Sequence, residues 1–422
     1  MKVSVKNKLS GGVKIPPSKS IAHRMLICAA CGGNACEIIC PQINKDIEAT
    51  MNCLNNLGAR ILYDGEKFTV NPIITPPKTA VLDCGESGAT LRFILPIAAA
   101  LGVKATFIGH GRLPERPLSV LCDVLKENGV TITNEGKLPF TISGKLNPGT
   151  FDIDGSISSQ FISGLLMALS LLKENSEINV LNKIESKSYI NITIDVLKQF
   201  GIKIKEENNK YFIPNNKNIH NPAKTIVPGD FSSAAFWITA AVVGKNPITC
   251  FELDYKKSCQ GDKKIVDILE EMGALIIVDD DFITGYPSKL HGIVIDCQDI
   301  PDLVPILSVA ASVAEGKTIF KNIERLRFKE SDRITATLNL LNSCGIDAYT
   351  NGNDLIITSN NQTPHDFVYN PFNDHRMVMT ATILAYAKNI TIDIINADCV
   401  SKSYPLFFDH FRKLHGTTII DF

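Results

Sequence analysis

The stretch Leu54-Asn55-Asn56-Leu57-Gly58-Ala59-Arg60-Ile61-Leu62 contains the pattern that decides the fold. A leucine stands four residues before a glycine, and an alternating apolar run follows, as where a helix ends and a strand begins. The pattern recurs at Gly58, Gly129, Gly201, Gly273 and Gly345, and Gly416 ends a sixth helix-like segment. Successive glycines of this series are 71, 72, 72, 72 and 71 residues apart. The sequence therefore predicts six copies of one α/β unit, with each glycine as the left-handed residue that ends a helix.

The two ends of the chain complement each other in this pattern. The sixth copy ends at residues 417–420 with one strand of its hairpin, and the strand-like segment 2–5 has no partner before it. We expect these two segments to pair and to close the sixth copy. A boundary near residues 226–229 leaves three copies on each side, which predicts an N-terminal domain of residues 14–227 and a C-terminal domain of residues 1–13 and 228–422.

Composition restricts the class of function. With 422 residues, 45% hydrophobic and 21% charged, the chain is typical of a two-domain globular protein. A formal net charge of −1 gives no support for a nucleic-acid or membrane partner. The first ten residues, MKVSVKNKLS, contain no apolar core of a signal peptide, and no apolar run is long enough to cross a bilayer. We expect a cytoplasmic protein.

Twelve cysteines are scattered along the chain. The spacing of Cys28, Cys31, Cys36 and Cys40 is compatible with zinc. However, Cys28 and Cys31 fall within an apolar helical pattern, where thiols act as small hydrophobic side chains. We expect reduced thiols and no metal.

One charged loop stands out, Arg325-Leu326-Arg327-Phe328-Lys329-Glu330-Ser331-Asp332-Arg333. It lies between a strand-like run and an apolar-periodic helix, and helix starts attract anions. Lys329 and Glu330 are adjacent, so an anion-binding cation and an acid/base carboxylate share one loop. On this stretch alone, a solvated charged loop is the better explanation of the composition.

Similar loops at other helix starts favour the functional interpretation. Residues 16–24, PPSKSIAHR, combine hydroxyls with two cations as a phosphate cradle would, without the glycine spacing of a P-loop. Cations and hydroxyls recur at residues 84–92, 109–117, 156–160, 186–189, 229–233, 373–376 and 401–405, and a carboxylate precedes a helix at 300–303. This distribution, in a chain without net positive charge, favours a small, multiply anionic substrate over a polymer.

The motifs PSKSIAHR (17–24), GSISSQF (155–161), RFKESDR (327–333), FNDHRM (372–377) and CVSKSYP (399–405) resemble the 5-enolpyruvylshikimate-3-phosphate (EPSP) synthase family in order and spacing. The resemblance covers nearly the full length. It implies two domains, each of three βαβαββ units with helices packed inside. It also implies transfer of the enolpyruvyl group of phosphoenolpyruvate to the 5-hydroxyl of shikimate 3-phosphate, with release of phosphate, on the route to chorismate and aromatic amino acids. The family uses no metal or organic cofactor and is the target of glyphosate. We expect a monomer acting on small molecules.

The resemblance also implies roles for individual residues. It makes Asp302 the base for the 5-hydroxyl and Glu330 the acid/base at the phosphoenolpyruvate methylene, with Lys19 and Lys329 as catalytic lysines. It assigns shikimate 3-phosphate to Lys19, Ser20, Arg24, Ser158, Ser159, Gln160, Ser186, Tyr189, Asp302 and Lys329. It assigns phosphoenolpyruvate to Lys19, Gly88, Arg92, Arg116, Gln160, Arg333, Arg376 and Lys402. These residues come from both halves of the chain, so we expect the site to need both domains and an open ligand-free form.

The chain departs from the family pattern at several positions. Glu86, Ala89, Thr90 and Phe93 replace the Asn, Thr, Ala and Pro that are common there, Arg325 replaces Asn, and Ser188 replaces Pro. These changes bear on the tightness of the phosphoenolpyruvate pocket and on glyphosate sensitivity.

Three rival functions remain to be weighed. The related UDP-N-acetylglucosamine enolpyruvyl transferase carries a cysteine in the loop that matches residues 109–117, and this chain has none there. An RNA 3′-phosphate cyclase would need a nucleotide-linked histidine and a basic RNA surface. A non-catalytic repeat scaffold would not need Lys19, Asp302 and Glu330 at helix starts.

Overall fold

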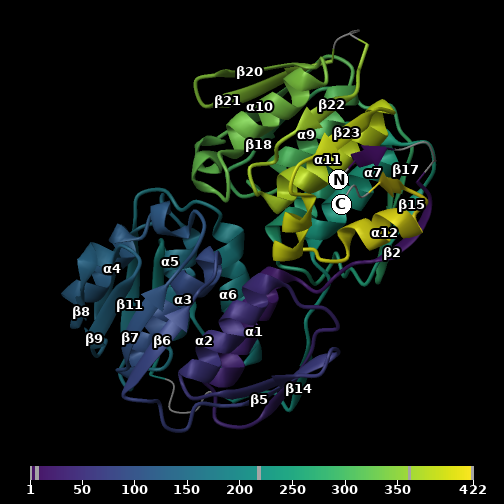
Figure 1. The fold of residues 1–422 in the computed structure, drawn as a ribbon. Helices are drawn as coiled ribbons and strands as arrows, with labels where there is room; N and C mark the ends of the chain where they lie inside the picture. The colour runs from purple at the N-terminus through teal and green to yellow at the C-terminus, as the bar shows by residue number, and fades with distance from the viewer. Residues whose placement is uncertain (1, 5–8, 216–219, 360–362, 420–422) are drawn as a thin grey trace. The chain divides into compact units, whose positions relative to one another are not determined.

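The computed structural model describes residues 2–4, 9–215, 220–359 and 363–419. Contacts divide the chain into an N-terminal unit, Pro17–Val227, and a C-terminal unit, Met1–Pro16 with Pro228–Phe422 (Figure 1). Each unit has its own hydrophobic core. The first crossing between units follows Pro16, three residues later than expected, and the second follows Val227.

The copies of the repeat share one topology, seen without interruption in the second copy. There β6 (Thr79–Asp83), α3 (Gly88–Leu101) and β7 (Lys104–Ile108) form a parallel crossover. Then α4 (Ser119–Glu127) leads to the hairpin β8 (Val130–Ile132) and β9 (Phe140–Gly144), and the strand order is β6-β7-β9-β8. The described residues form six such four-stranded sheets, which confirms the predicted α/β repeat.

The remaining elements of the N-terminal unit belong to two more copies. The first has α1 (Lys19–Ala30), β3 (Cys36–Ile39), α2 (Lys45–Asn56), β4 (Arg60–Tyr63) and β5 (Lys67–Asn71). The third has β10 (Thr150–Asp154), α5 (Ser159–Leu169), β11 (Ser176–Leu181), α6 (Lys187–Gln199), β12 (Lys205–Glu207) and β13 (Lys210–Ile213).

The C-terminal unit repeats the arrangement. Its elements are α7 (Phe231–Val243), β15 (Ile248–Phe251), α8 (Ile265–Glu271), β16 (Leu275–Val278) and β17 (Phe282–Tyr286); β18 (Val294–Asp296), α9 (Val304–Val313), β19 (Lys317–Lys321), α10 (Arg333–Ser343), β20 (Asp347–Asn351) and β21 (Asp354–Thr358); and β22 (Phe367–Tyr369), α11 (His375–Lys388), β23 (Thr391–Ile394), α12 (Phe407–Lys413) and β24 (Thr417–Ile419). Short 3-10 helices η1 (Leu113–Glu115), η2 (Asn134–Gly136), η3 (Gly261–Lys264), η4 (Glu324–Phe328) and η5 (Ala397–Lys402) lie in the connections.

Two copies exchange their first strands. The strand before α1, β2 (Gly11–Lys14), pairs in parallel with β15 of the C-terminal unit, with Cys250 opposite Val13. The strand before α7, β14 (Lys224–Ile226), pairs in parallel with β3 of the N-terminal unit, with Thr225 opposite Ile38. This exchange accounts for both crossings of the chain from one unit to the other.

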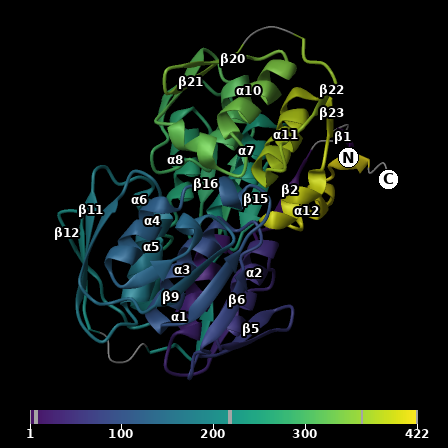
Figure 2. The same cartoon turned by 60° about the vertical axis from the view of Figure 1, so that its left-hand side comes forward.

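The ends of the chain meet in the sixth sheet. There β1 (Lys2–Ser4) lies between β23 and β24 and is antiparallel to both, with Val3 opposite Ile392 and Thr418 (Figure 2). The predicted closure is confirmed for residues 2–4 and 417–419, while residues 5 and 420 lie outside the described part.

The glycines of the repeat end five helices as predicted. Gly58, Gly129, Gly201, Gly273 and Gly345 all have positive φ, between 77° and 106°. The prediction is wrong for Gly416, because His415 takes the left-handed conformation at φ 73°. Gly416 is needed for a different reason, since any side chain there would run into the ring of Phe411.

The helices differ in burial according to their place in the copy. The first helix of each copy (α1, α3, α5, α7, α9, α11) is buried over most of its length. The second (α2, α4, α6, α8, α10, α12) buries one side. A helix that is apolar all round belongs in a core, so the first helices form the centre of each unit and bring their N-termini together there. No helix of the described residues is long and apolar enough to traverse a membrane.

Candidate active site

The charged loop of residues 325–333 ends at the N-terminus of α10. Asp332 caps this helix, accepting hydrogen bonds from the backbone amides of Ile334 (3.1 Å) and Thr335 (3.2 Å). Aspartate is a preferred capping residue because it satisfies the amides that the first turn leaves open. The cap starts the helix at Arg333 and thereby directs the Arg333 side chain toward the core.

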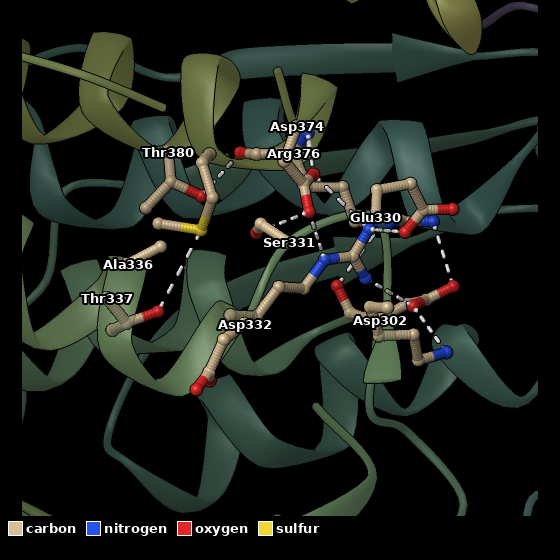
Figure 3. A network of polar contacts seen from close by, with 12 residues as sticks. Asp302, Glu330, Ser331, Asp332, Ala336, Thr337, Asp374, Arg376 and Thr380 are labelled. Atoms are coloured by element: carbon tan, nitrogen blue, oxygen red, sulfur yellow. Dashed lines mark hydrogen bonds and ion pairs between the residues drawn. The ribbon is translucent and has the colours of Figure 1, made fainter. Parts of the chain in front are cut away.

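Three carboxylates surround the Arg333 guanidinium, which is 1% exposed. Its Nε donates to Asp374 (2.8 Å), one Nη to Asp302 (2.8 Å), and the other to Glu330 (2.7 Å). Ser331 also donates to Asp374, at 3.0 Å. Figure 3 shows Asp302, Glu330, Ser331 and Asp374 facing one another. We call these residues with Arg333, Arg376 and Lys329 the carboxylate cluster.

Three cationic side chains contact the Asp302 carboxylate. It precedes α9, and its carboxylate is also contacted by Lys329 (Nζ–Oδ1 3.3 Å) and Arg376 (Nη2–Oδ2 3.1 Å). Arg376 enters from the first turn of α11, where Asp374 is the cap and accepts from the Arg376 backbone amide (2.9 Å). Asp302 is thus one carboxylate held by three cations from three elements.

Burial and charge shift the titration of this cluster. Burial lowers the pKa of Lys329 to about 8, against the opposing effect of Asp302. Burial acts to lower the pKa of Arg333, but the carboxylates of Asp374, Glu330 and Asp302 outweigh it and raise that pKa above its ordinary value. Burial opposes ionisation of Asp374, yet the Arg333 charge leaves its pKa below the usual value. The cluster therefore contains a lysine that can exchange protons near neutral pH.

Two of the expected cations of the N-terminal unit, Lys19 and Arg24, lie on α1. Lys19 is the first residue of that helix and pairs with Asp46 of α2 at 3.0 Å. Arg24, 2% exposed, donates to Thr193 (2.6 Å) and to the carbonyls of Ser20 (2.6 Å) and Tyr189 (3.1 Å). Within the described residues Arg24 has no carboxylate partner, and burial lowers its pKa to about 10.

The starts of α3 and α5 meet through Arg92 and Gln160. Arg92 donates to the Gln160 side chain at 2.7 Å and stacks over Phe161, with 5.3 Å from its carbon to the ring centre. Arg116 lies against Gly88, where an added Cβ would be 2.6 Å from its Nη1. A side chain at residue 88 would therefore displace the end of the Arg116 side chain from its present position.

A buried polar chain supports the same helix starts. His23 Nδ1 contacts the Thr50 hydroxyl at 2.7 Å, Thr50 contacts Thr90 at 2.7 Å, and Thr90 donates to Ser87 at 2.8 Å. Burial holds the pKa of His23 well below its ordinary value, with Lys19 and Arg24 adding to the effect. His23 is 1% exposed and packs within α1 as a neutral side chain.

The other expected site residues lie at helix starts. Ser158 caps α5 and accepts from the Gln160 amide (3.3 Å), Ser159 is the first residue of α5, and Ser186 precedes α6 with a left-handed φ of 52°. Lys402 of η5 donates to the carbonyl of Asn373 at 2.9 Å, beside Asp374. The serines belong to the N-terminal unit and Lys402 belongs to the C-terminal unit.

Sequence reasoning overlooked two acidic residues. Asp374 stands inside a quoted motif, and its position before a helix was the available signal. Asp46 has no comparable signal, because its contact with Lys19 spans 27 residues. The described residues contain no group of three or more His, Cys, Asp or Glu that could hold a metal. Burial raises the pKa of Cys31 and of Cys40 to about 12, which disfavours the thiolates that bind zinc.

Comparison with solved structures identifies the fold of the chain. Its fold is similar to an EPSP synthase from Acinetobacter baumannii (TM-score 0.81, 22% identity, 98% of this chain and 97% of that one). It is also similar to the enolpyruvyl transferase NikO from Streptomyces tendae (TM-score 0.77, 19% identity, 99% and 97%).

Sequence comparison identifies the family. The family model for EPSP synthase (3-phosphoshikimate 1-carboxyvinyltransferase) matches residues 3–411. Proteins named 3-phosphoshikimate 1-carboxyvinyltransferase from Clostridium kluyveri and Clostridium acetobutylicum are each 41% identical, over 97% of this chain and 96% of theirs. The chain belongs to the EPSP synthase family, whose reaction joins phosphoenolpyruvate to shikimate 3-phosphate in the shikimate pathway.

Proposed function

We propose that the chain transfers the enolpyruvyl group of phosphoenolpyruvate to the 5-hydroxyl of shikimate 3-phosphate, with Asp302 and Glu330 as its acid/base carboxylates. The observation that carries the assignment is the contact of Asp302 with Lys329, Arg333 and Arg376. Such a group can accept a proton beside cations that attract an anionic substrate.

The reaction divides into an addition and an elimination. Glu330 delivers a proton to the methylene carbon of phosphoenolpyruvate, which leaves oxocarbenium character at the neighbouring carbon. The 5-hydroxyl oxygen bonds to that carbon while Asp302 takes the hydroxyl proton, giving a tetrahedral ketal. Loss of a methyl proton to Glu330 then breaks the carbon–oxygen bond to phosphate and restores the double bond. Lys329, whose pKa is about 8, lies within reach of Asp302 and serves as its proton partner.

The remaining residues bind the two anions. Shikimate 3-phosphate is assigned to Lys19, Ser20, Arg24, Ser158, Ser159, Gln160, Ser186 and Tyr189, with Asp302 and Lys329 at its reacting end. Phosphoenolpyruvate is assigned to Lys19, Gly88, Arg92, Arg116, Gln160, Arg333, Arg376 and Lys402. The lack of a carboxylate partner for buried Arg24 supports an anion-binding role, because its charge is uncompensated within the described residues.

Phosphate release tests the function. Wild-type protein should release phosphate from phosphoenolpyruvate in the presence of shikimate 3-phosphate, and not without it or with UDP-N-acetylglucosamine as the acceptor. Asp302→Asn should abolish most of this release, whereas Asp347→Asn, the same change on the exposed strand β20, should leave it intact. Release with the UDP-sugar alone would identify the other enolpyruvyl transferase instead.

We also propose that the enzyme is a cytoplasmic monomer without a metal or organic cofactor. Sedimentation at working concentrations and cell fractionation test the first two statements. Full activity in excess EDTA is expected, and a loss that zinc reverses would contradict the third.

A further inference from the structure

The Arg24 guanidinium is held along its edge by neutral acceptors. It donates to the Thr193 hydroxyl (2.6 Å), the Ser163 hydroxyl (3.3 Å) and the Tyr189 carbonyl (3.1 Å). Within the described part of the chain, its Nη1 donates to the Ser20 carbonyl alone (2.6 Å), although this nitrogen carries two N–H groups. One N–H of Nη1 therefore remains for an anion, and its direction depends on the plane of the guanidinium.

An aromatic ring covers the guanidinium. The central carbon of the Arg24 guanidinium is 4.8 Å from the centre of the Phe93 ring of α3. The same ring meets His23, the residue before Arg24, edge-on at 6.3 Å and 82°. Phe93 is 0% exposed and Arg24 is 2% exposed. The electron-rich face of a phenyl ring attracts a cation, and the attraction is stronger where water is excluded.

The same arrangement recurs one copy further along the chain. Arg92 of α3 lies over Phe161 of α5, and both side chains are buried. In both cases the arginine of one copy's first helix lies over a phenylalanine in the first helix of the next copy. The packing of these helices thus places a ring against each of two arginines that we assign to substrate binding.

We propose that Phe93 is a positioning residue for shikimate 3-phosphate: its ring sets the plane of the Arg24 guanidinium and so directs the remaining N–H of Nη1 toward the substrate anion. The inference rests on the proposed role of Arg24. A carboxylate in the place of the ring would neutralise Arg24 and compete with the substrate, whereas a ring stabilises the cation and leaves its charge to the anion. Phe93 is also a position at which this chain departs from the family pattern.

The first test changes the electron density of the ring while nearly keeping its shape. A phenylalanine trifluorinated on the ring, inserted site-specifically at residue 93, attracts a cation less strongly. Calorimetric titration should show a dissociation constant for shikimate 3-phosphate raised on the order of fivefold. Phe93→Leu, which removes the ring, should raise it on the order of tenfold. The kcat at saturating substrates and the KM for phosphoenolpyruvate should stay near their wild-type values, because Arg24 is assigned to the other substrate.

Phe151 provides the matched control. It is 0% exposed, lies in β10 of the same unit, and has no cation over its ring among the described residues. Phe151→Leu should lower stability without changing the dissociation constant, and trifluorination of Phe151 should leave that constant unchanged as well. Unaltered affinity in the protein trifluorinated at Phe93, or an equal change in the Phe151 controls, overturns the proposal.

A double-mutant cycle tests the contact without any ligand. Denaturant unfolding compares Phe93→Leu, Arg24→Met and the double variant. If the ring holds the cation, the double variant loses less free energy of unfolding than the sum of the two single losses. The losses of Phe151→Leu and Arg24→Met should add. Additive losses for Phe93→Leu and Arg24→Met would also overturn the proposal.

These measurements separate the proposal from the proposed function. If the wild-type protein does not bind shikimate 3-phosphate, the proposed function is contradicted, and the cycle still decides whether Phe93 holds Arg24. If Phe93→Leu does not fold, the protein trifluorinated at Phe93 decides the question through its affinity.

Discussion

Two lysine–carboxylate pairs, one in each unit, are nearly copies of each other. Lys19–Asp46 spans 3.0 Å with the side chains 21% and 16% exposed, and Lys329–Asp302 spans 3.3 Å with 20% and 15% exposed. In both pairs the partners are 27 residues apart. In each copy, the start of the first helix therefore lies next to the start of the second helix. The lysine comes from the first helix in one pair and from the segment before the second helix in the other.

The surroundings of the two pairs are different. Within the described residues Asp46 is paired with Lys19 alone, whereas Asp302 also meets Arg333 and Arg376. The buried arginines differ in the same sense, since Arg333 contacts carboxylates and Arg24 contacts hydroxyls and carbonyls. One topology thus supports a buried arginine among carboxylates in the C-terminal unit and a buried arginine among hydroxyls and carbonyls in the N-terminal unit.

The strongest test of this difference replaces each buried arginine with methionine. Arg333→Met removes one cation that three carboxylates share, so the free energy of unfolding should fall by about 3–5 kcal/mol. Arg24→Met leaves only neutral acceptors and should cost about 1–3 kcal/mol. Denaturant unfolding followed by circular dichroism measures both variants, and emission of Trp237, the one tryptophan of the chain, reports on the C-terminal unit. Equal losses would show that the carboxylate cluster has no special energetic role.

A second test asks whether the C-terminal unit supplies the chemistry and the N-terminal unit the binding. Glu330→Gln keeps the shape of the side chain but removes its titrating proton, so kcat should fall on the order of 10²-fold with little change in affinity for shikimate 3-phosphate. Arg24→Ala should weaken that affinity first. Steady-state kinetics and calorimetric titration separate the two effects, and the distinction between units fails if both variants change affinity alone.

A third test uses the strands that link distant parts of the chain. Val3 lies in β1, between two neighbours, so Val3→Pro removes a ladder hydrogen bond and should cost roughly 1–3 kcal/mol. Ile226→Pro changes the edge strand β14, where the Val227 amide donates to Ile39 and the Ile226 amide points away, so little should change. Thermal unfolding measures both, and an unaltered melting temperature for Val3→Pro would contradict the importance of chain closure.

The smallest expected effect is a pH shift that distinguishes the two lysines. With its pKa at about 8, Lys329 is a cation below that pH and loses its charge above it, so kcat should fall as pH rises through about 8. Lys329→Arg keeps the cation and should remove this decline, even if the maximum rate is lower. Lys19→Arg should leave the decline in place. A decline that vanishes only in Lys19→Arg would assign it to the N-terminal unit.

Much of the candidate site could be predicted from local sequence. The loop of residues 325–333 and the hydroxyl-rich helix starts could be recognised in the sequence. Capping residues and glycines set the backbone conformation of the few residues around them, so their effect is local. The contact between Asp302 and Arg376 was not visible, since the two residues are 74 positions apart and come from different copies. The hydrogen bond from Arg333 to Asp374, which spans 41 residues, was missed for the same reason.

The sequence by itself determined the six-copy repeat, five of the six helix ends, and the pairing of the two chain ends, because hydrophobic period and glycine conformation are local properties. Only the tertiary structure decided that β2 and β14 change places, since strands of three or four residues carry too little pattern to select a partner. It also decided which cations are neutralised. The partners of a charged side chain cannot be found from its neighbours in the sequence. They depend on which helix N-termini are brought together by the packing of the core.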